Sequence, residues 1–418
     1  MHSQNSPAPE LLDQAFKALD GFQIEVPSWG FANTGTRFGK FVQPAAATTL
    51  KEKFADAAEV NRLTGATPTM ALHVLWDLPN GVRDIGELRV LESRYGIRAG
   101  SINPNLFQDQ QYKFGSLCNP DAGIRRQALD HVLDSIEIAR ACGSRDISLW
   151  LADGSNYPGS QSMRRRIEWL EDALHTAHAA LGPEQRLLVE YKPFEPAFYH
   201  TDIADWGMAS HLARAAGPQA RVLVDTGHHY NAQNIEQIVA WLLHTGLLGG
   251  FHFNDRRYAD DDLTLGSIDP YQIFRIFHEL QNGHELQSGH ELQSEHELQN
   301  EQDQSLLHAM AFMIDQSHNL KGKIEATVQT VVTAQELWLK ASLINRELLA
   351  RHQQACDIVA AEELFRGAFW TDVRPLAAAW RAARGLAPDP LKALREGGYV
   401  ERAAAERGSR SATVSSYA

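Results

Sequence analysis

Four strand-like apolar segments of the chain each end in a residue that can bind a metal or exchange a proton. These residues are Glu190, Asp225, His252 and Asp315. Carboxylate oxygens combined with an imidazole nitrogen favour Mn²⁺, Mg²⁺ or Co²⁺ over a metal selected by thiolates, and Zn²⁺ remains possible. Because the same ending recurs on successive strands, the pattern predicts one site for a divalent cation.

More ionisable residues follow two of these strand ends. His228 comes three residues after Asp225, and Asp260 and Asp262 stand in the loop after the next strand. In an extended chain alternate side chains point the same way, so an Asp-x-Asp sequence would direct two carboxylates together. We therefore expect His228, Asp260 and Asp262 to hold a second cation, with Asp225 bridging the two.

Each of these residues also has an ordinary structural interpretation. A single carboxylate at a strand end usually caps a helix or faces solvent. His252, between two phenylalanines, could be a hydrogen-bonded core histidine, and residues 260–262 could be a solvated loop. Independent capping would not place such residues on consecutive strands, and this joint occurrence favours the metal site.

The elements that would position these residues alternate between strand and helix. Apolar periodicity is clearest in the helix expected over 124–141. Alternation of this kind indicates parallel strands joined by right-handed helical crossovers. No GxGxxG or Walker-type loop follows the first strand, which weakens a doubly wound nucleotide-binding sheet. The strands are expected over 22–26, 69–75, 97–102, 146–151, 187–190, 221–225, 250–253 and 309–314.

The predicted fold is thus an α/β (β/α)8 TIM barrel over residues 1–350, with its active site at the carboxyl ends of the strands. Residues 351–418 are expected to form a C-terminal helical extension and a frayed tail. One long helix is expected over 324–350. The remaining helices are expected over 163–180, 203–216, 235–244, 271–280, 357–366 and 372–384.

Composition narrows the class of protein. The 418 residues carry a net charge of −13, which argues against a general nucleic-acid binder or a protein of anionic membranes. Three cysteines without CxxC spacing fit a reducing cytoplasm. We find no signal peptide, and no apolar run approaches the roughly 20 residues that span a bilayer. These features predict a cytoplasmic protein without nucleic-acid or membrane partners.

A repeated His-Glu-Leu-Gln sequence occupies residues 284–299. Its histidines, His284, His290 and His296, are six residues apart and would turn by about 240° around a helix, so they do not share a face. We expect a repeat-expanded surface loop before the eighth strand, on the barrel face opposite the site, rather than a metal site.

Several motifs are specific when they occur together in one chain. They are Glu190-x-Lys192, Asp225-Thr226-Gly227-His228, His252-Phe253-Asn254-Asp255, Asp260-x-Asp262 and Phe312-Met313-Ile314-Asp315-Gln316-Ser317-His318. This set resembles the bacterial L-rhamnose isomerases of the xylose isomerase-like barrel superfamily, most closely the broad-specificity type that also converts D-allose and D-psicose. The resemblance spans roughly residues 15–385, and the His-Glu-Leu-Gln repeat departs from it.

The resemblance implies a metal-dependent aldose–ketose isomerase that converts L-rhamnose to L-rhamnulose by a hydride shift between C2 and C1. It implies a homotetramer acting on small aldose and ketose sugars, with two divalent cations per subunit, of which Mn²⁺ is favoured over Co²⁺, Mg²⁺ or Zn²⁺. The four strand-end residues would hold a structural ion. The set of Asp225, His228, Asp260 and Asp262 would hold a catalytic ion near C1 and C2.

The resemblance also implies catalytic roles for other residues. His73, at the end of the second strand, would relay a proton during sugar ring opening, with Asp77 or Asp109 as its partner. Lys192 would hydrogen-bond O1, although it could equally be a salt-bridge partner for a carboxylate. Ser317 would orient a metal-bound water.

Aromatic residues near strand ends could wall a sugar pocket. Trp29 and Trp150 are the preferred candidates, whereas Phe31 and Trp76 are more typical of core residues. Phe38 lies in the Gly-flanked segment 35–41, which in the resembling family covers the active site of the adjacent subunit.

Other functions remain open on the same barrel. A sugar 3-epimerase needs a symmetric pair of glutamate bases, whereas the eighth strand here ends in Asp315. A phosphodiesterase-like endonuclease would need a basic groove, against the acidic charge of the chain. A non-catalytic sugar-binding barrel would differ from an isomerase by having no turnover that depends on a metal.

Overall fold

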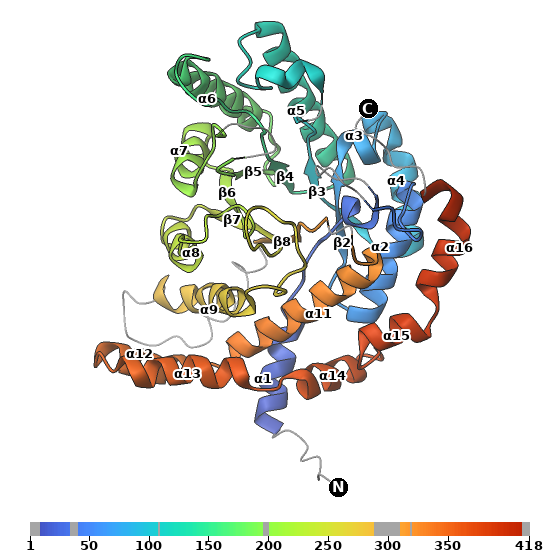
Figure 1. Ribbon diagram of the computed structural model, residues 1–418, viewed down its shortest axis with the longest axis vertical. Helices are drawn as coiled ribbons and strands as arrows, with labels where there is room; N and C mark the ends of the chain where they lie inside the picture. The colour runs from blue at the N-terminus through green and yellow to red at the C-terminus, as the bar shows by residue number, and fades with distance from the viewer. Residues whose placement is uncertain are drawn as a thin grey trace.

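In the computed structural model of the protein, eight parallel strands form one sheet in sequence order and curve into a nearly closed barrel surrounded by helices (Figure 1). The structure describes residues 9–33, 41–107, 109–194, 200–287, 310–317 and 320–411. The first and last strands meet through Glu25, whose N–H donates to Phe312 O at 2.7 Å and whose carbonyl accepts from Ile314 N at 2.9 Å. The predicted TIM barrel is confirmed.

The strands are short, as the sequence predicts, and each runs toward the same rim of the barrel. Their bounds are β1 Val26–Pro27, β2 Thr69–His73, β3 Arg98–Asn103, β4 Asp146–Leu149, β5 Arg186–Glu190, β6 Ala220–Asp225, β7 Leu248–Phe253 and β8 Ala311–Ile314. Strands of a parallel barrel are covered on both faces, so consecutive residues can all be apolar. Leu187, Leu188 and Val189 of β5 are all fully buried.

Helices cover the outside of the barrel and connect its strands. The described helices up to β8 are α1 Pro9–Asp20, α2 Leu50–Thr64, α3 Val74–Asp77, α4 Ile85–Tyr95, α5 Ala122–Cys142, α6 Met163–Ala179, α7 Trp206–Ala216, α8 Ile235–His244 and α9 Pro270–Gln287, with 3-10 turns η1 Ser28–Phe31, η2 Gly81–Asp84 and η3 Gln110–Phe114. Asp121, Asp205 and Asn234 begin α5, α7 and α8 by accepting hydrogen bonds from first-turn N–H groups. None of the helices among the described residues combines the length and apolarity that crossing a membrane requires.

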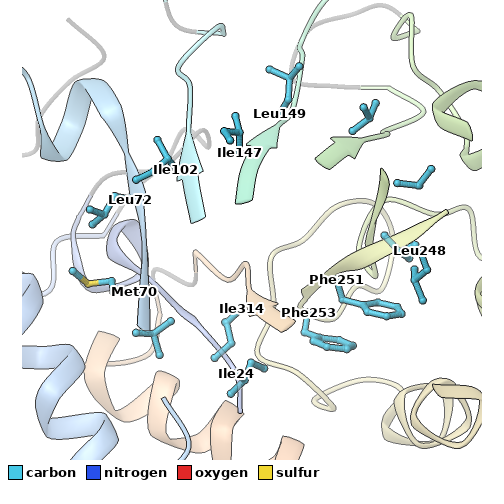
Figure 2. Packing of buried hydrophobic residues seen from close by; sticks show 14 of the residues in the cluster. Ile24, Met70, Leu72, Ile102, Ile147, Leu149, Leu248, Phe251, Phe253 and Ile314 are labelled. Carbon is cyan, nitrogen blue, oxygen red and sulfur yellow. The ribbon is translucent and has the colours of Figure 1, made fainter. Parts of the chain in front are cut away.

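The core continues from the strands into the helical layer. Figure 2 shows buried side chains from opposite sides of the barrel, among them Leu72 of β2, Ile147 of β4 and Phe253 of β7. The ring of Phe253 stacks on Phe251 with centroids 4.8 Å apart and meets Phe277 of α9 edge-on at 5.3 Å. This packing fixes the strands, and with them the residues at the strand ends.

The helices after β8 differ from those expected. The predicted helix 324–350 is two helices, because the side chain of Asn345 accepts a hydrogen bond from Leu348 N and begins a new helix there. Residues 390–411, assigned no helix from the sequence, form two more. The bounds are α11 Lys323–Ser342, α12 Arg346–Gln354, α13 Ile358–Trp370, α14 Arg374–Ala383, α15 Pro390–Glu396 and α16 Tyr399–Ser411.

The last helix is anchored to the barrel by a buried ion pair. Arg407 of α16 donates to both carboxylate oxygens of Asp56 of α2, at 2.8 and 2.9 Å. Bidentate pairs of this kind are among the stronger charged contacts in proteins. The end of the C-terminal extension, α16, is therefore held to α2, at the right of Figure 1.

Two expectations at the edges of elements were wrong. The first strand, expected over 22–26, is confined to Val26–Pro27, although Phe22 and Ile24 are buried. The repeat was expected to be a loop, but its first four residues, 284–287, belong to α9. Residues 288–299, which include His290 and His296, lie outside the described residues.

Candidate metal centre and pocket

The carboxyl ends of β5 to β8 bring the predicted strand-end residues together. His252 Nδ1 lies 3.2 Å from Glu190 Oε2, 4.0 Å from Asp225 Oδ2 and 3.9 Å from Asp315 Oδ2. The sheet register explains this, because Asp225 of β6 pairs directly with His252 of β7. Atoms of all four side chains lie close enough to hold one metal ion.

His252 lacks the hydrogen bonds of an ordinary core histidine. Both of its ring nitrogens are buried and neither has a hydrogen-bond partner among the described residues. Buried polar atoms are normally satisfied, so an imidazole without a partner that faces three carboxylates fits a metal ligand. Burial acts to lower the pKa of His252, but Glu190 and Asp315 outweigh it and raise the pKa to about 9.

A second group of possible ligands adjoins the first. His228 Nε2 lies 3.3 Å from Asp260 Oδ2 and 3.8 Å from Asp225 Oδ2. The other ring nitrogen of His228, Nδ1, lies 3.0 Å from the carbonyl oxygen of Tyr191. A hydrogen bond there places the proton on Nδ1 and leaves Nε2 free to bind a metal. Asp225 belongs to both groups, as expected for a bridging ligand.

Asp260 and Asp262 lie at the site, but not as the extended Asp-x-Asp pair that the sequence predicts. The loop after β7 returns to the barrel where Asp255 and Leu263 exchange backbone hydrogen bonds at 3.0 Å. Asp262 has a positive φ of 48°, so the two aspartates do not form an extended pair. Both line the pocket, but Asp262 is not part of the compact second group, which Asp225, His228 and Asp260 make up.

The centre carries more buried negative charge than its own side chains can balance. Burial raises the pKa of Asp225, and repulsion from Asp260 and Glu190 raises it further. Burial likewise raises the pKa of Asp315. For Glu190 burial acts in the same direction, but His252 and His228 outweigh it and lower the pKa. Buried carboxylates this close together need compensating cations, which divalent metal ions would supply.

Neighbouring groups orient the carboxylates. Trp29 Nε1 donates to Asp315 Oδ1 at 2.8 Å, and Asn254 Nδ2 donates to Asp225 Oδ1 at 3.0 Å. A Cβ on Gly227 would come within 2.7 Å of Asn254 Oδ1 and 2.8 Å of Asp260 Oδ1, so any larger residue here would displace these two side chains. Sequence reasoning missed the role of Asn254, although this residue stands in one of the quoted motifs.

Aromatic side chains line the other half of a hollow of about 660 Å³, a volume that includes its open mouth. The ring of His73 lies 4.7 Å from Trp29, 4.2 Å from Trp76 and 5.7 Å from Phe107, and Phe107 lies 4.9 Å from Trp150. These residues end or follow β1 to β4, whereas the carboxylates end or follow β5 to β8. The pocket is therefore apolar on one side and acidic on the other.

The predicted aromatic residues divide between pocket and core. Trp29, Trp150 and Trp76 line the hollow, and Phe107, which sequence reasoning missed, joins them. Phe31 is fully buried in the main core. Phe38 lies outside the described residues.

His73 lines the pocket, but its predicted carboxylate partners do not contact the imidazole. Asp77 instead accepts hydrogen bonds from the backbone N–H of His73 at 2.9 Å, Ser28 Oγ at 2.6 Å and Lys53 Nζ at 2.5 Å. Asp109 is exposed. The Nδ1 atom of His73 is buried without a hydrogen-bond partner among the described residues, and burial lowers the pKa of the ring to about 3.

Lys192 and Ser317 also line the pocket. Lys192 Nζ forms an ion pair with Asp260 Oδ2 at 2.6 Å and lies 5.3 Å from the centre of the Trp150 ring. The lysine therefore joins the acidic and aromatic sides of the pocket. The backbone N–H of Ser317 donates to Asp262 O at 3.3 Å, which ties the segment after β8 to the loop after β7.

The rim around the pocket carries exposed apolar side chains. At least one stands in the connection after each of the eight strands, and we call a set of eight, one from each connection, the apolar rim. Tyr258 is the most exposed, at 86%. The members are Phe41, Leu75, Phe114, Tyr157, Phe194, Tyr230, Tyr258 and Leu320.

Comparison with known proteins agrees with this architecture. Residues 68–314 match the model of the family described as "Xylose isomerase-like TIM barrel". The chain is 39% identical over 401 residues to a probable sugar isomerase of Rhizobium meliloti, with 95% of this chain and 89% of the relative covered. A probable sugar isomerase of Mesorhizobium japonicum is 38% identical over 405 residues, with coverage of 95% and 88%.

A solved structure resembles the fold at low sequence identity. The D-allulose 3-epimerase from a Methylomonas species superimposes with a TM-score of 0.51 at 12% identity, covering 74% of this chain and 95% of that one. At this identity the likeness concerns the barrel fold alone.

Proposed function

The chain belongs to the xylose isomerase-like TIM barrel family, and from that premise we propose that it is a metal-dependent aldose–ketose isomerase. The observation that carries the proposal is the buried imidazole of His252, which lies within 4.0 Å of three carboxylates while its ring nitrogens have no well-aligned hydrogen-bond partner among the described residues. An aromatic wall opposite the acids supports a sugar as the substrate, because sugars present C–H faces to aromatic rings. The relatives described as probable sugar isomerases support the same class of reaction.

We propose that the centre holds two divalent cations, with Mn²⁺ preferred. Glu190, Asp225, His252 and Asp315 would hold one ion. Asp225, His228, Asp260 and Asp262 would hold the other. When bound, such ions act as Lewis acids that polarise substrate oxygens and stabilise developing negative charge.

Other side chains would bind the sugar and move its protons. Lys192, already directed into the pocket by Asp260, would donate a hydrogen bond to O1. Burial lowers the pKa of His73 to about 3, so the ring is neutral at physiological pH and offers one N–H donor and one acceptor nitrogen, through which it would relay a proton during ring opening. Ser317 would help to position a water. Trp29 would hold Asp315 in place through its indole N–H while also facing the sugar.

The finer proposal concerns the substrate. The motifs of the sequence favour conversion of L-rhamnose to L-rhamnulose, with activity on other aldoses such as D-allose. We propose that hydrogen passes directly from C2 to C1 as a hydride. In D₂O this route leaves C1 of the product without solvent deuterium, whereas a cis-enediol route would incorporate it.

Metal removal tests the proposed function. Treatment with a chelator should abolish conversion of aldose to ketose, and added Mn²⁺ or Co²⁺ should restore it, because the buried carboxylates then regain their counter-charge. Ketose formation should be measured over a panel that includes L-rhamnose, L-mannose, L-lyxose and D-allose. The fold should be followed by circular dichroism throughout.

Three outcomes would contradict parts of the proposal. Turnover that survives complete metal removal would refute the metal-dependent mechanism. Epimerisation of ketoses at C3 without aldose formation would identify a sugar 3-epimerase instead. Sugar binding without turnover on any member of the panel, with metal present, would identify a binding barrel.

We also propose that the protein is a homotetramer, as the resembling family implies. Each connection that follows a strand carries an exposed apolar side chain, and a partner that covered this end of the barrel would bury them together. The apolar rim, which follows all eight strands, supports association through this face of the barrel.

A further inference from the structure

A buried arginine joins the two loops that carry the second group of ligands. Arg256 follows β7, and only 8% of the residue is exposed. Its guanidinium donates to three backbone carbonyls of the loop after β6: Nε to His229 O at 2.7 Å, Nη1 to Thr226 O at 3.1 Å and Nη2 to Tyr230 O at 3.3 Å. One side chain thus holds several carbonyls of a neighbouring loop.

The carbonyls that Arg256 holds flank His228. Thr226 precedes this histidine by two residues, and His229 follows it directly. Arg256 itself stands four residues before Asp260, in the loop that returns to the barrel at Asp255 and Leu263. The hydrogen bonds of Arg256 therefore connect the backbone around His228 to the base of the loop that carries Asp260.

The same loop is braced from the opposite side by Tyr191. Its carbonyl accepts from His228 Nδ1 at 3.0 Å, and its hydroxyl lies 2.7 Å from His229 Nε2. Tyr191 follows β5, so these contacts fix the loop relative to β5. Toward the loop after β7, Thr226 Oγ1 donates to Asn254 O at 3.0 Å and Asn231 Nδ2 donates to Arg257 O at 3.2 Å. Arg256 adds three further hydrogen bonds, and these reach the carbonyls on both sides of His228.

The first group of ligands is positioned differently. Glu190, Asp225 and His252 are residues of strands, and Asp315 directly follows one. Backbone hydrogen bonds of the barrel hold these positions, and the side chain of Arg256 hydrogen-bonds to none of the four. A change at Arg256 should therefore affect the two groups unequally.

We propose that Arg256 is a positioning residue for the second cation site, an inference that rests on the proposed function. It sets the distance between His228 on one loop and Asp260 on the next, and it touches neither the substrate nor a cation. Groups that orient metal ligands in this way typically contribute about 10- to 100-fold to metal affinity.

The planar guanidinium is essential to this role. Arginine offers five N–H donors in a fixed geometry, whereas lysine offers a single charged point on a flexible stem. A lysine at position 256 would keep the buried positive charge but could not span three carbonyls. Arg256→Lys therefore separates the geometry of the arginine from its charge.

The test is calorimetric titration of MnCl₂ into the metal-free full-length protein. The variants are Arg256→Lys and Arg256→Gln, with Asp260→Asn as the reference for loss of the second site. Arg257→Gln is the matched control, because Arg257 is the adjacent arginine of the same loop and is exposed. Thermal unfolding of each metal-free variant reports on the fold.

The Arg257→Gln variant should bind two ions, each with the affinity that the wild-type protein shows for it. Both Arg256 variants should bind one ion as the wild type does and the other at least about tenfold more weakly, matching the direction of Asp260→Asn. If Arg256→Gln fails to fold, Arg256→Lys, which retains the buried charge, decides the question.

The titration distinguishes failure of the proposed two-cation centre from failure of the positioning role of Arg256. A wild-type protein that binds fewer than two Mn²⁺ ions would overturn the two-cation centre of the proposed function. If the wild type binds two ions, the role of Arg256 would be overturned by variants that bind both normally. It would equally be overturned by variants that weaken both sites by the same factor, which is what a general structural role predicts.

Discussion

At the scale of single residues, His73 illustrates how the pocket controls proton binding. Its imidazole is surrounded by aromatic rings, and burial lowers its pKa to about 3, against about 6.5 in an unfolded chain. Between these values the unfolded chain binds a proton that the folded protein does not. The contribution of His73 to the free energy of unfolding therefore falls as the pH falls from about 6.5 toward about 3.

Replacement of His73 should reduce the acid sensitivity of folding. In metal-free protein, His73→Gln should make the slope of unfolding free energy against pH shallower by about 1.4 kcal/mol per pH unit between about pH 4.5 and 5.5. Urea unfolding over this range measures the slope. His175→Gln is the control, because His175 is exposed. If His73→Gln leaves the slope unchanged, the His73 ring of the wild type binds a proton in the folded protein as readily as in the unfolded chain.

The residues of the candidate site differ in how readily sequence predicts them. Asp225 and His252 could be expected to meet, because parallel strands end at the same rim of a barrel and both are the terminal polar residues of apolar runs. Phe107 could not, since it stands in a loop where no periodicity constrains its direction. The contacts of Asp77 with Lys53 and Ser28 depend on side-chain packing, which spacing does not reveal.

At the scale of elements, the loop between Asp255 and Leu263 returns two carboxylates to the barrel. We expect Asp260→Asn combined with Asp262→Asn to lower turnover by at least about 100-fold, because both acids face the pocket. Loss of a group that only supports a metal ligand already lowers activity by about 10- to 100-fold, and loss of the ligands themselves should lower it further. Steady-state ketose formation measures the loss, and circular dichroism should show an intact barrel.

Asp261→Asn serves as the control for this loop. The Asp261 side chain accepts hydrogen bonds from Arg257 N and Tyr258 N, and asparagine keeps an acceptor oxygen there. Its turnover should stay close to that of the wild type. A double variant at 260 and 262 with near-normal turnover would remove both aspartates from the proposed second site.

The elements themselves were largely predictable, and the exceptions have local causes. Seven of the strands were expected close to their observed bounds, because most of them are short apolar runs covered on both faces. The break between α11 and α12 was missed because apolar periodicity continues through it, while Asn345 supplies a helix start. The αL conformation of Asp262 was missed because the residue type alone does not fix φ.

At the scale of the whole molecule, the apolar rim bears on assembly. Size-exclusion chromatography with light scattering should give four times the 46.5 kDa mass of the chain. Tyr157→Ser combined with Tyr258→Ser should weaken association by at least about tenfold, since large aromatic residues dominate the energetics of interfaces. Dilution series of the wild type and the variant compare their association.

Val90→Ser on α4 is the control, because Val90 is also exposed, at 65%, but lies on an outer helix rather than on the apolar rim. The Val90→Ser variant should have the same mass by light scattering as the wild-type protein. A monomeric wild type over the whole dilution series would refute the tetramer, and a double variant that associates normally would exclude the apolar rim as the contact.

The division of the hollow into aromatic and acidic halves also has a stereochemical consequence. A pyranose has one flatter hydrocarbon side and an edge crowded with hydroxyls. Turned over, it would press those hydroxyls against Trp29 and Trp76 and leave Glu190 and Asp315 opposite bare C–H groups. A sugar bound as proposed would therefore be oriented before any of its bonds change, and mirror-image sugars would differ in which of their oxygens reach the carboxylates.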